Sequence, residues 1–138
     1  DQERQQAAAL VQLIESAPLT PEADQARFNV LAWLTEIPDI TVVGCLQLLG
    51  TEDETAGLPA ALTMHHAFAA ARYAIEHPGA PGDSDQAMVA GVLGTLRAYA
   101  SLRTAQTVAP NQLLDRLAGL GDSEALHSYV KDRMRLCR

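Results

Sequence analysis

Residues 84–106, with the sequence SDQAMVAGVLGTLRAYASLRTAQ, predict a long helix at the centre of the fold. One side of this helix carries large apolar residues: Met88, Val92, Leu96 and Tyr99. Another side carries small residues: Ala87, Gly91, Gly94, Ala98 and Ser101. Each of the two interior glycines costs about 1 kcal/mol of helix propensity, so a compensating contact is expected. We therefore expect a neighbouring helix to approach the small side closely, and the central helix to be covered on two sides.

Helix boundaries recur on both sides of this stretch. Further helices are predicted over residues 2–16, 20–36, 59–76, 110–120 and 124–136. In the helix over 59–76, the expected buried stripe consists of Ala61, Met64, Phe68, Ala71 and Ile75. No linker divides the chain, so residues 1–138 are expected to form a single helical domain. The sequence therefore predicts an all-α fold, a single compact irregular or orthogonal bundle of about five to seven helices around the central helix.

Residues 40–49 carry conflicting signals. Ile40-Thr41-Val42-Val43 is β-branched and strand-like, whereas Cys45-Leu46-Gln47-Leu48-Leu49 before Gly50 is typical of the end of a helix. A lone strand would find no partner in a chain that is otherwise helical. We therefore expect a short helix capped by Asp39, with a strand as the alternative.

The only two cysteines are Cys45 and Cys137, and Cys137 is one residue from the end of the chain. We expect them to form a disulfide that ties the last helix to the middle of the fold, which favours an exported protein, periplasmic or secreted. The chain also begins at Asp1 rather than Met, as a protein does after signal-peptide removal, although a truncated chain would begin in the same way. The alternative is a cytoplasmic protein with two reduced thiols, at least one of them buried.

Charge and hydropathy exclude two classes of partner. The formal net charge is −7 and the pI is about 4.9, so a phosphate backbone would be repelled, and nucleic acid is not an expected partner. The longest uncharged stretch, residues 55–71, contains Pro59 and two histidines and is too short and too polar to span a bilayer.

A metal site is one hypothesis for the histidines. Glu124 and His127 have the i, i+3 spacing of half a carboxylate di-metal motif. His65 or His66 could complete such a site if the two helices face each other, but adjacent residues diverge by about 100° and make a poor chelate on their own. The competing interpretation is that all four residues are surface or capping side chains. No cofactor is expected, and no group of residues matches a catalytic motif.

Acidic residues cluster at Glu52, Asp53 and Glu54, in a segment predicted to be a loop. Such a loop is a possible contact for a partner protein. The function favoured by the sequence is a small, exported bacterial protein that binds another protein without catalysis, as a periplasmic inhibitor or immunity protein does. The alternatives are an enzyme or metal-binding bundle that uses the histidines, and a small-molecule pocket between the helices over 59–76 and 84–106.

Overall fold

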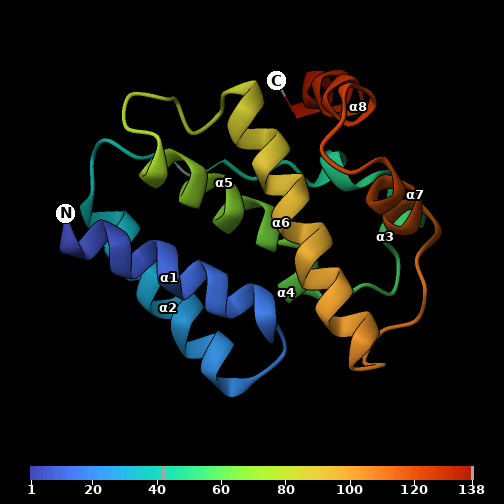
Figure 1. The fold of residues 1–138 in the computed structure, drawn as a ribbon, viewed down its shortest axis with the longest axis horizontal. Coiled ribbons are helices and arrows are strands. Elements are labelled where there is room, and N and C mark those ends of the chain that lie inside the picture. Colours follow the sequence, from blue (N-terminus) through green and yellow to red (C-terminus); the bar gives the residue numbers. More distant parts are fainter. Residues whose placement is uncertain (42, 138) are drawn as a thin grey trace.

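Helix α6 (Asp85–Thr104) crosses the middle of the bundle in the computed structural model, which describes residues 1–41 and 43–137 (Figure 1). The elements around it are α1 (Gln2–Ser16), α2 (Pro21–Glu36), η1 (Leu46–Leu49), α3 (Glu52–Thr55), α4 (Ala60–Thr63), α5 (His65–Glu76), α7 (Gln112–Leu120), α8 (Glu124–Met134) and η2 (Arg135–Cys137). None of the described residues lies in a strand, and six α-helices remain when the one-turn helices α3 and α4 are set aside. The predicted all-α bundle is confirmed. No helix in the described part of the chain is long and apolar enough to cross a membrane.

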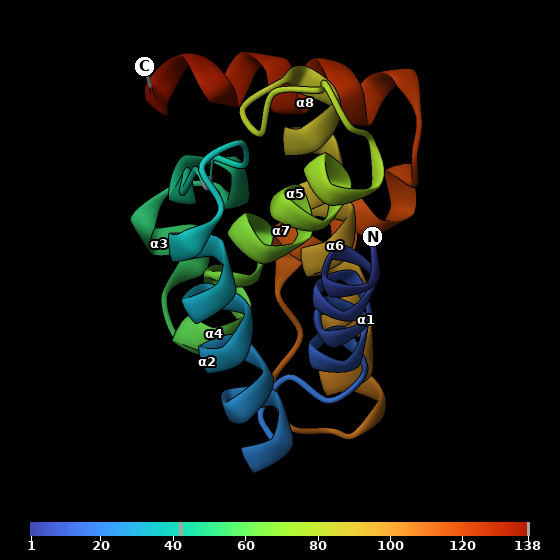
Figure 2. The same ribbon diagram turned by 90° about the vertical axis from the view of Figure 1, so that its left-hand side faces the viewer.

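Two sides of α6 are covered, as its two stripes predict. The large apolar stripe is buried in a cluster with residues of α7 and α8, and α8 lies across one end of the bundle (Figure 2). Gly91 and Gly94 of the small stripe face α5, which crosses behind α6 in Figure 1. Both stripes are buried, except for Ser101, which is half-buried.

The glycines of α6 mark the closest contact between helices. A Cβ atom added to Gly91 would lie 2.7 Å from the carbonyl oxygen of His66, and one added to Gly94 would overlap the Cβ of Ala69. Real Cβ atoms do not approach so closely, so only glycine permits this contact. The expected compensation for the two glycines is therefore confirmed. Helix α5 fills the space directly beside Gly91, and Ala69 of α5 lies beside Gly94 together with Glu15 of α1.

We expect Gly94→Ala to lower the free energy of unfolding by about 2 kcal/mol, because the new methyl group overpacks the contact between α5 and α6. Gly119→Ala is a matched control, since Gly119 lies in α7 with nothing within 4 Å of its added Cβ. That change should raise stability by about 0.5 kcal/mol through helix propensity. Urea denaturation of both variants measures the difference. Equal stability of the two variants would contradict the close packing.

The predicted helix over 59–76 is interrupted at Met64, where α4 ends and α5 begins. The imidazole Nδ1 of His66 donates to the carbonyl oxygen of Thr63 (2.6 Å), and the amide of Ala67 donates to the carbonyl oxygen of Met64 (3.1 Å). The side chain thus takes an acceptor that a continuous helix would use for its own backbone. Met64 turns outward with 51% of its surface exposed, so its predicted place in the buried stripe is wrong.

Within residues 40–49, the described residues form one short 3₁₀ helix and no strand. A 3₁₀ helix, η1, begins only after Cys45, and it has no side-chain cap. Asp39 does not cap it, because the N-cap position is Cys45, and the Asp39 carboxylate instead accepts a hydrogen bond from Arg4 (2.7 Å). Val42, the centre of the β-branched run, lies outside the described residues. The described part of this segment is otherwise irregular, so the predicted short helix is confined to Leu46–Leu49, and its predicted cap by Asp39 is wrong.

The expected disulfide joins Cys45 and Cys137, whose Cα atoms are 5.8 Å apart and whose sequence separation is 92 residues. It connects η2, at the end of α8, to the residue before η1. Two side chains of α8 donate hydrogen bonds to carbonyl oxygens of η1: Tyr129 Oη at 3.0 Å and Arg133 Nε at 2.6 Å. The last helix is therefore held to the irregular segment by one covalent bond and two hydrogen bonds.

Candidate functional site

The four candidate metal ligands do not meet in the fold. His65 and His66 lie in α5 and are 0% and 2% exposed. Glu124 and His127 lie in α8, where His127 Nε2 is 2.7 Å from an Asp122 carboxylate oxygen on the surface. Among the described residues, no three His, Cys, Asp or Glu side chains lie close enough together to hold a metal ion. The interpretation of all four as surface or capping residues is also wrong for the two buried histidines.

Both ring nitrogens of His66 are used inside the protein. Nε2 accepts a hydrogen bond from the backbone amide of Cys45 (2.8 Å), so the proton lies on Nδ1, which donates to the carbonyl oxygen of Thr63. Burial lowers the pKa of His66, and the bond to Thr63 offsets only part of this effect. A neutral His66 therefore connects the start of α5 to the disulfide-bonded residue Cys45.

A buried carboxylate cluster joins three helices: Glu15 of α1, His65 of α5 and Arg97 of α6. Glu15 is only 5% exposed. One of its carboxylate oxygens lies 2.9 Å from His65 Nε2, and the other accepts a hydrogen bond from Arg97 Nε (2.8 Å). The remaining ring nitrogen of His65 is buried and has no hydrogen-bond partner among the described residues.

The surroundings of Glu15 favour its charged form. Burial by itself raises the pKa of this carboxyl group. The hydrogen bonds from His65 and Arg97 and the positive charge of Arg97 lower the pKa by more than burial raises it. The net result is a pKa below the ordinary value of 4.5, so Glu15 is ionised at neutral pH. Because both of its oxygens already accept hydrogen bonds, Glu15 acts as a connection between helices rather than as a free base.

Motif searching could not find this cluster, because 50 and 82 residues separate Glu15 from its two partners. The one local signal is the position of Glu15 on its own helix. It follows buried Val11 by four residues, which places a carboxylate on the apolar side of α1. A charged residue in such a position needs a partner from another element.

The acidic segment is a single helical turn, α3, rather than the predicted loop. Thr51 and Glu54 form a capping box: the amide of Glu54 donates to Thr51 Oγ1 (3.2 Å), and the amide of Thr51 donates to a Glu54 carboxylate oxygen (3.0 Å). The bond from the Thr51 amide holds the pKa of Glu54 below its ordinary value. Glu52 and Asp53 are exposed and form no ion pair with any described residue. The capping box therefore fixes the turn and leaves these two carboxylates free for a partner.

An apolar groove of about 300 Å³ lies where α2, η1 and the junction of α4 with α5 meet. Its lining consists of Leu31, Leu34, Gly44, Leu46, Met64, His66, Ala67 and Phe68. Three of the large side chains at this groove are exposed: Leu31 by 44%, Leu46 by 55% and Met64 by 51%. Phe28 lies one turn before Leu31 on α2 and is 68% exposed. Hydrophobic periodicity assigned Met64 to the core and left Leu31, Leu46 and Phe28 unassigned, so this groove was not predicted from the sequence.

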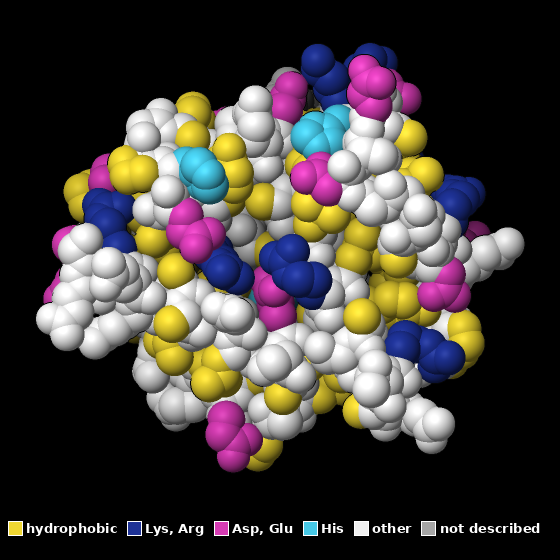
Figure 3. All heavy atoms as spheres, in the orientation of Figure 1, with side chains coloured by type: hydrophobic (Ala, Val, Ile, Leu, Met, Phe, Trp, Pro, Cys, Tyr) yellow, Lys and Arg dark blue, Asp and Glu magenta, His cyan; other side chains and the backbone are white. Residues whose placement is uncertain are grey.

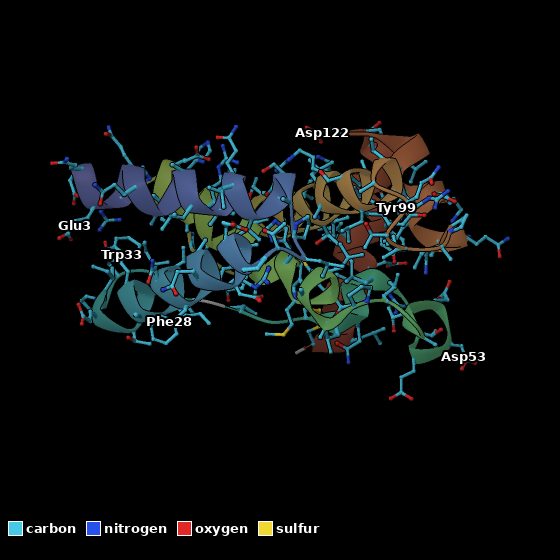
Figure 4. All side chains as sticks on the ribbon, turned by 90° about the horizontal axis from the view of Figure 1, so that it is seen from below. Glu3, Phe28, Trp33, Asp53, Tyr99 and Asp122 are labelled. Carbon is cyan, nitrogen blue, oxygen red and sulfur yellow. A yellow bond between two sulfur atoms is a disulfide. The ribbon has the colours of Figure 1, made fainter. Side chains whose placement is uncertain are left out.

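Phe28, one helical turn from the groove residue Leu31, lies on the same side of the molecule as the acidic turn. Figure 4 shows Phe28 of α2 and Asp53 of α3 projecting from the same side, opposite the side that α1 covers. The side chains that could meet a partner here are therefore apolar at the groove and acidic at α3.

Comparison with known proteins leaves the function to be inferred from this geometry alone. No family model, curated protein or solved structure matches the chain.

Proposed function

We propose that the protein is a non-catalytic protein-binding module of the inhibitor or immunity type. The observation that carries this proposal is the apolar groove, where Leu31, Leu46 and Met64 are exposed together. Contiguous patches of large apolar side chains are uncommon on soluble monomers and mark sites of interaction. Burying one such side chain completely in an interface contributes about 1.5–3 kcal/mol. A few of them therefore supply enough energy for specific binding.

The chemistry of the groove selects an apolar segment of the partner. None of the lining residues carries a charge, because His66 is held neutral and both its ring nitrogens are hydrogen-bonded inside the protein. A polar group placed here would lose its hydrogen bonds to water and find no replacement. Leu-, Met- or Phe-sized side chains fit both the polarity and the volume of the groove.

Charge further restricts the partner to a basic segment. Asp53 projects from the same side of the molecule as Phe28, which lies one helical turn from the groove residue Leu31, and the whole chain carries a net charge of −7. Lys or Arg residues beside the apolar anchors would accelerate association and fix the orientation of the complex. An amphipathic helix with anchors at i and i+4 and a basic flank satisfies both requirements. Such a helix of the partner protein is the proposed occupant of the apolar groove.

The disulfide supports an exported location for this module, in the periplasm or outside the cell. Disulfides persist in oxidising compartments and are rare in the cytosol. The bond joins residues 92 positions apart and anchors both η1 and the end of α8. It therefore holds in place the segment that contributes Leu46 to the groove. The proposed target would then be met in the same oxidising compartment.

A displayed library of helical peptides tests the proposal directly, with the folded, oxidised protein as bait. We expect the selected peptides to carry two apolar anchors followed by Lys or Arg. Leu31→Asp should weaken their binding by about tenfold to a hundredfold, because it places a charge in the groove. Leu13→Asp is the matched control, since Leu13 has almost the same exposure (43%) but lies on α1. Binding to this control should be unchanged.

A double variant, Glu52→Gln with Asp53→Asn, tests whether the acidic turn contacts the partner. We expect slower association and a weaker dependence on salt, with little change in dissociation. Peptides that lack paired apolar anchors, or that bind Leu31→Asp as tightly as the parent protein, would refute the groove as the contact. Unchanged association of the double variant would remove the acidic turn from the interface.

A further inference from the structure

A second hollow lies between α1, α5 and α6 and shares no lining residue with the apolar groove. Its volume is about 490 Å³. Figure 3 shows positively and negatively charged side chains gathered together at the centre of this face. The charged residues that line it are Glu15, Arg72, Glu76 and Arg97. We call this hollow the charged cleft.

Hydrogen-bond donors outnumber free acceptors in the charged cleft. Arg72 is 23% exposed, and its guanidinium makes no hydrogen bond with any described residue, although Nε lies 3.3 Å from a Glu76 carboxylate oxygen. Arg97 uses only Nε and one terminal nitrogen, both toward Glu15. The Nε of Arg72 is buried, so the terminal nitrogens of Arg72 and the donors left on Arg97 are those available to a ligand.

The acceptor side of the charged cleft is largely occupied. Both oxygens of Glu15 already accept hydrogen bonds, one from His65 and the other from Arg97. The same contacts hold Arg97 in place. The Arg97 side chain as a whole is 55% exposed. Glu76 is also partly exposed and holds Arg72 only by a contact within its own helix turn. A second oxyanion could replace that contact with little cost.

We propose that the charged cleft binds a small molecule through an oxyanion group, carboxylate or phosphate, held by the guanidiniums of Arg72 and Arg97. The planar arrangement of guanidinium donors matches both kinds of oxyanion. The net charge of −7 opposes anions at long range, so the contact depends on these local donors. This site goes beyond the proposed protein-binding function. The test of anion binding in the charged cleft and the test of peptide binding in the apolar groove do not depend on each other.

Nuclear magnetic resonance titration of the folded, oxidised protein tests the site. Inorganic phosphate and succinate are added separately, with sodium chloride of equal ionic strength as the reference. We expect saturable shifts of backbone amides around Arg72 and Arg97 with at least one of the two anions. The tighter anion identifies the ligand as a phosphate or a carboxylate.

Substitutions then assign the binding to the two arginines. Arg72→Gln should weaken binding by roughly tenfold to a hundredfold, because it removes charge-assisted hydrogen bonds. Arg135→Gln removes the same charge from an exposed ion pair between η2 and Asp132 of α8 and should leave binding unchanged. Glu76→Gln releases Arg72 from its neighbour and should tighten binding.

Three results would overturn the site. They are shifts no larger than those in chloride, equal loss of binding in Arg72→Gln and Arg135→Gln, and full binding by Arg72→Gln. Thermal unfolding of each variant confirms that it is folded, and the expected gain in Glu76→Gln keeps the test decisive if Arg72→Gln is unstable.

Discussion

Replacing Cys45 and Cys137 together by serine is expected to lower the free energy of unfolding by about 4–5 kcal/mol. The disulfide closes a loop with a sequence separation of 92 residues, and the constraint on the unfolded chain grows with the length of the loop. Since domains are commonly stable by about 5–15 kcal/mol, this one bond carries a large share of the total. Urea denaturation of the parent protein and the double variant measures the loss.

Reduction of the parent protein provides the control for the serine substitutions. Oxidised parent protein should be the most stable form, and reduced parent protein should resemble the double variant. Helix α8 should remain folded in both under native conditions, because Leu126, Val130 and Met134 are buried in the main core. Hydrogen exchange would then increase mainly in η1 and η2. A loss below about 1 kcal/mol would contradict the chain-entropy argument for this bond.

Local sequence signals were sufficient for most of the framework. Thr20 and Pro21 predict the start of α2, and the Thr20 hydroxyl does accept the amide of Ala23 (3.2 Å). Gly91 and Gly94 predict a close helix contact, and α5 supplies it. These features depend on neighbours within one or two helical turns, so they can be predicted directly from the sequence.

Contacts between distant residues could not be predicted in the same way. His66 interrupts the helix over 59–76 because its ring lies between the Thr63 carbonyl and the amide of Cys45, and only the tertiary fold brings Cys45 there. Exposed Leu31 and Met64 have the same side chains as core residues, so hydrophobic patterning placed them inside or left them unmarked. The candidate site was missed because its signal is exposure, which a sequence does not contain.

The buried carboxylate cluster leads to the second large effect. Glu15→Gln is expected to lower the free energy of unfolding by about 2–4 kcal/mol. The amide cannot balance the charge of Arg97, and its nitrogen would replace one of two oxygens that now accept hydrogen bonds from His65 and Arg97. Because Arg97 is 55% exposed and can be hydrated again, the expected loss is smaller than for a fully buried ion pair. Urea denaturation at neutral pH measures it.

Glu76→Gln is the matched control for this change. Glu76 also faces an arginine, Arg72, but its side chain is 45% exposed and the pair lies within one helix. Exposed pairs of this kind contribute about 0.3–0.5 kcal/mol, so the control should differ little from the parent protein. Equal losses of unfolding free energy in Glu15→Gln and Glu76→Gln would show that the buried cluster stabilises the fold no more than an exposed ion pair does.

The pH dependence of stability separates the charge of Glu15 from its packing. The folded protein holds the pKa of Glu15 below the ordinary value of 4.5, so the unfolded chain binds the proton more readily. The stabilisation is therefore fully present above this ordinary value and is lost as the pH falls through the lowered pKa. Asp39 and Glu54, whose pKa values are also lowered, contribute to the same acid loss in both proteins. The difference between parent protein and Glu15→Gln should consequently shrink as the pH falls below the ordinary value. A difference that stays constant with pH would assign the loss to packing rather than to the carboxylate charge.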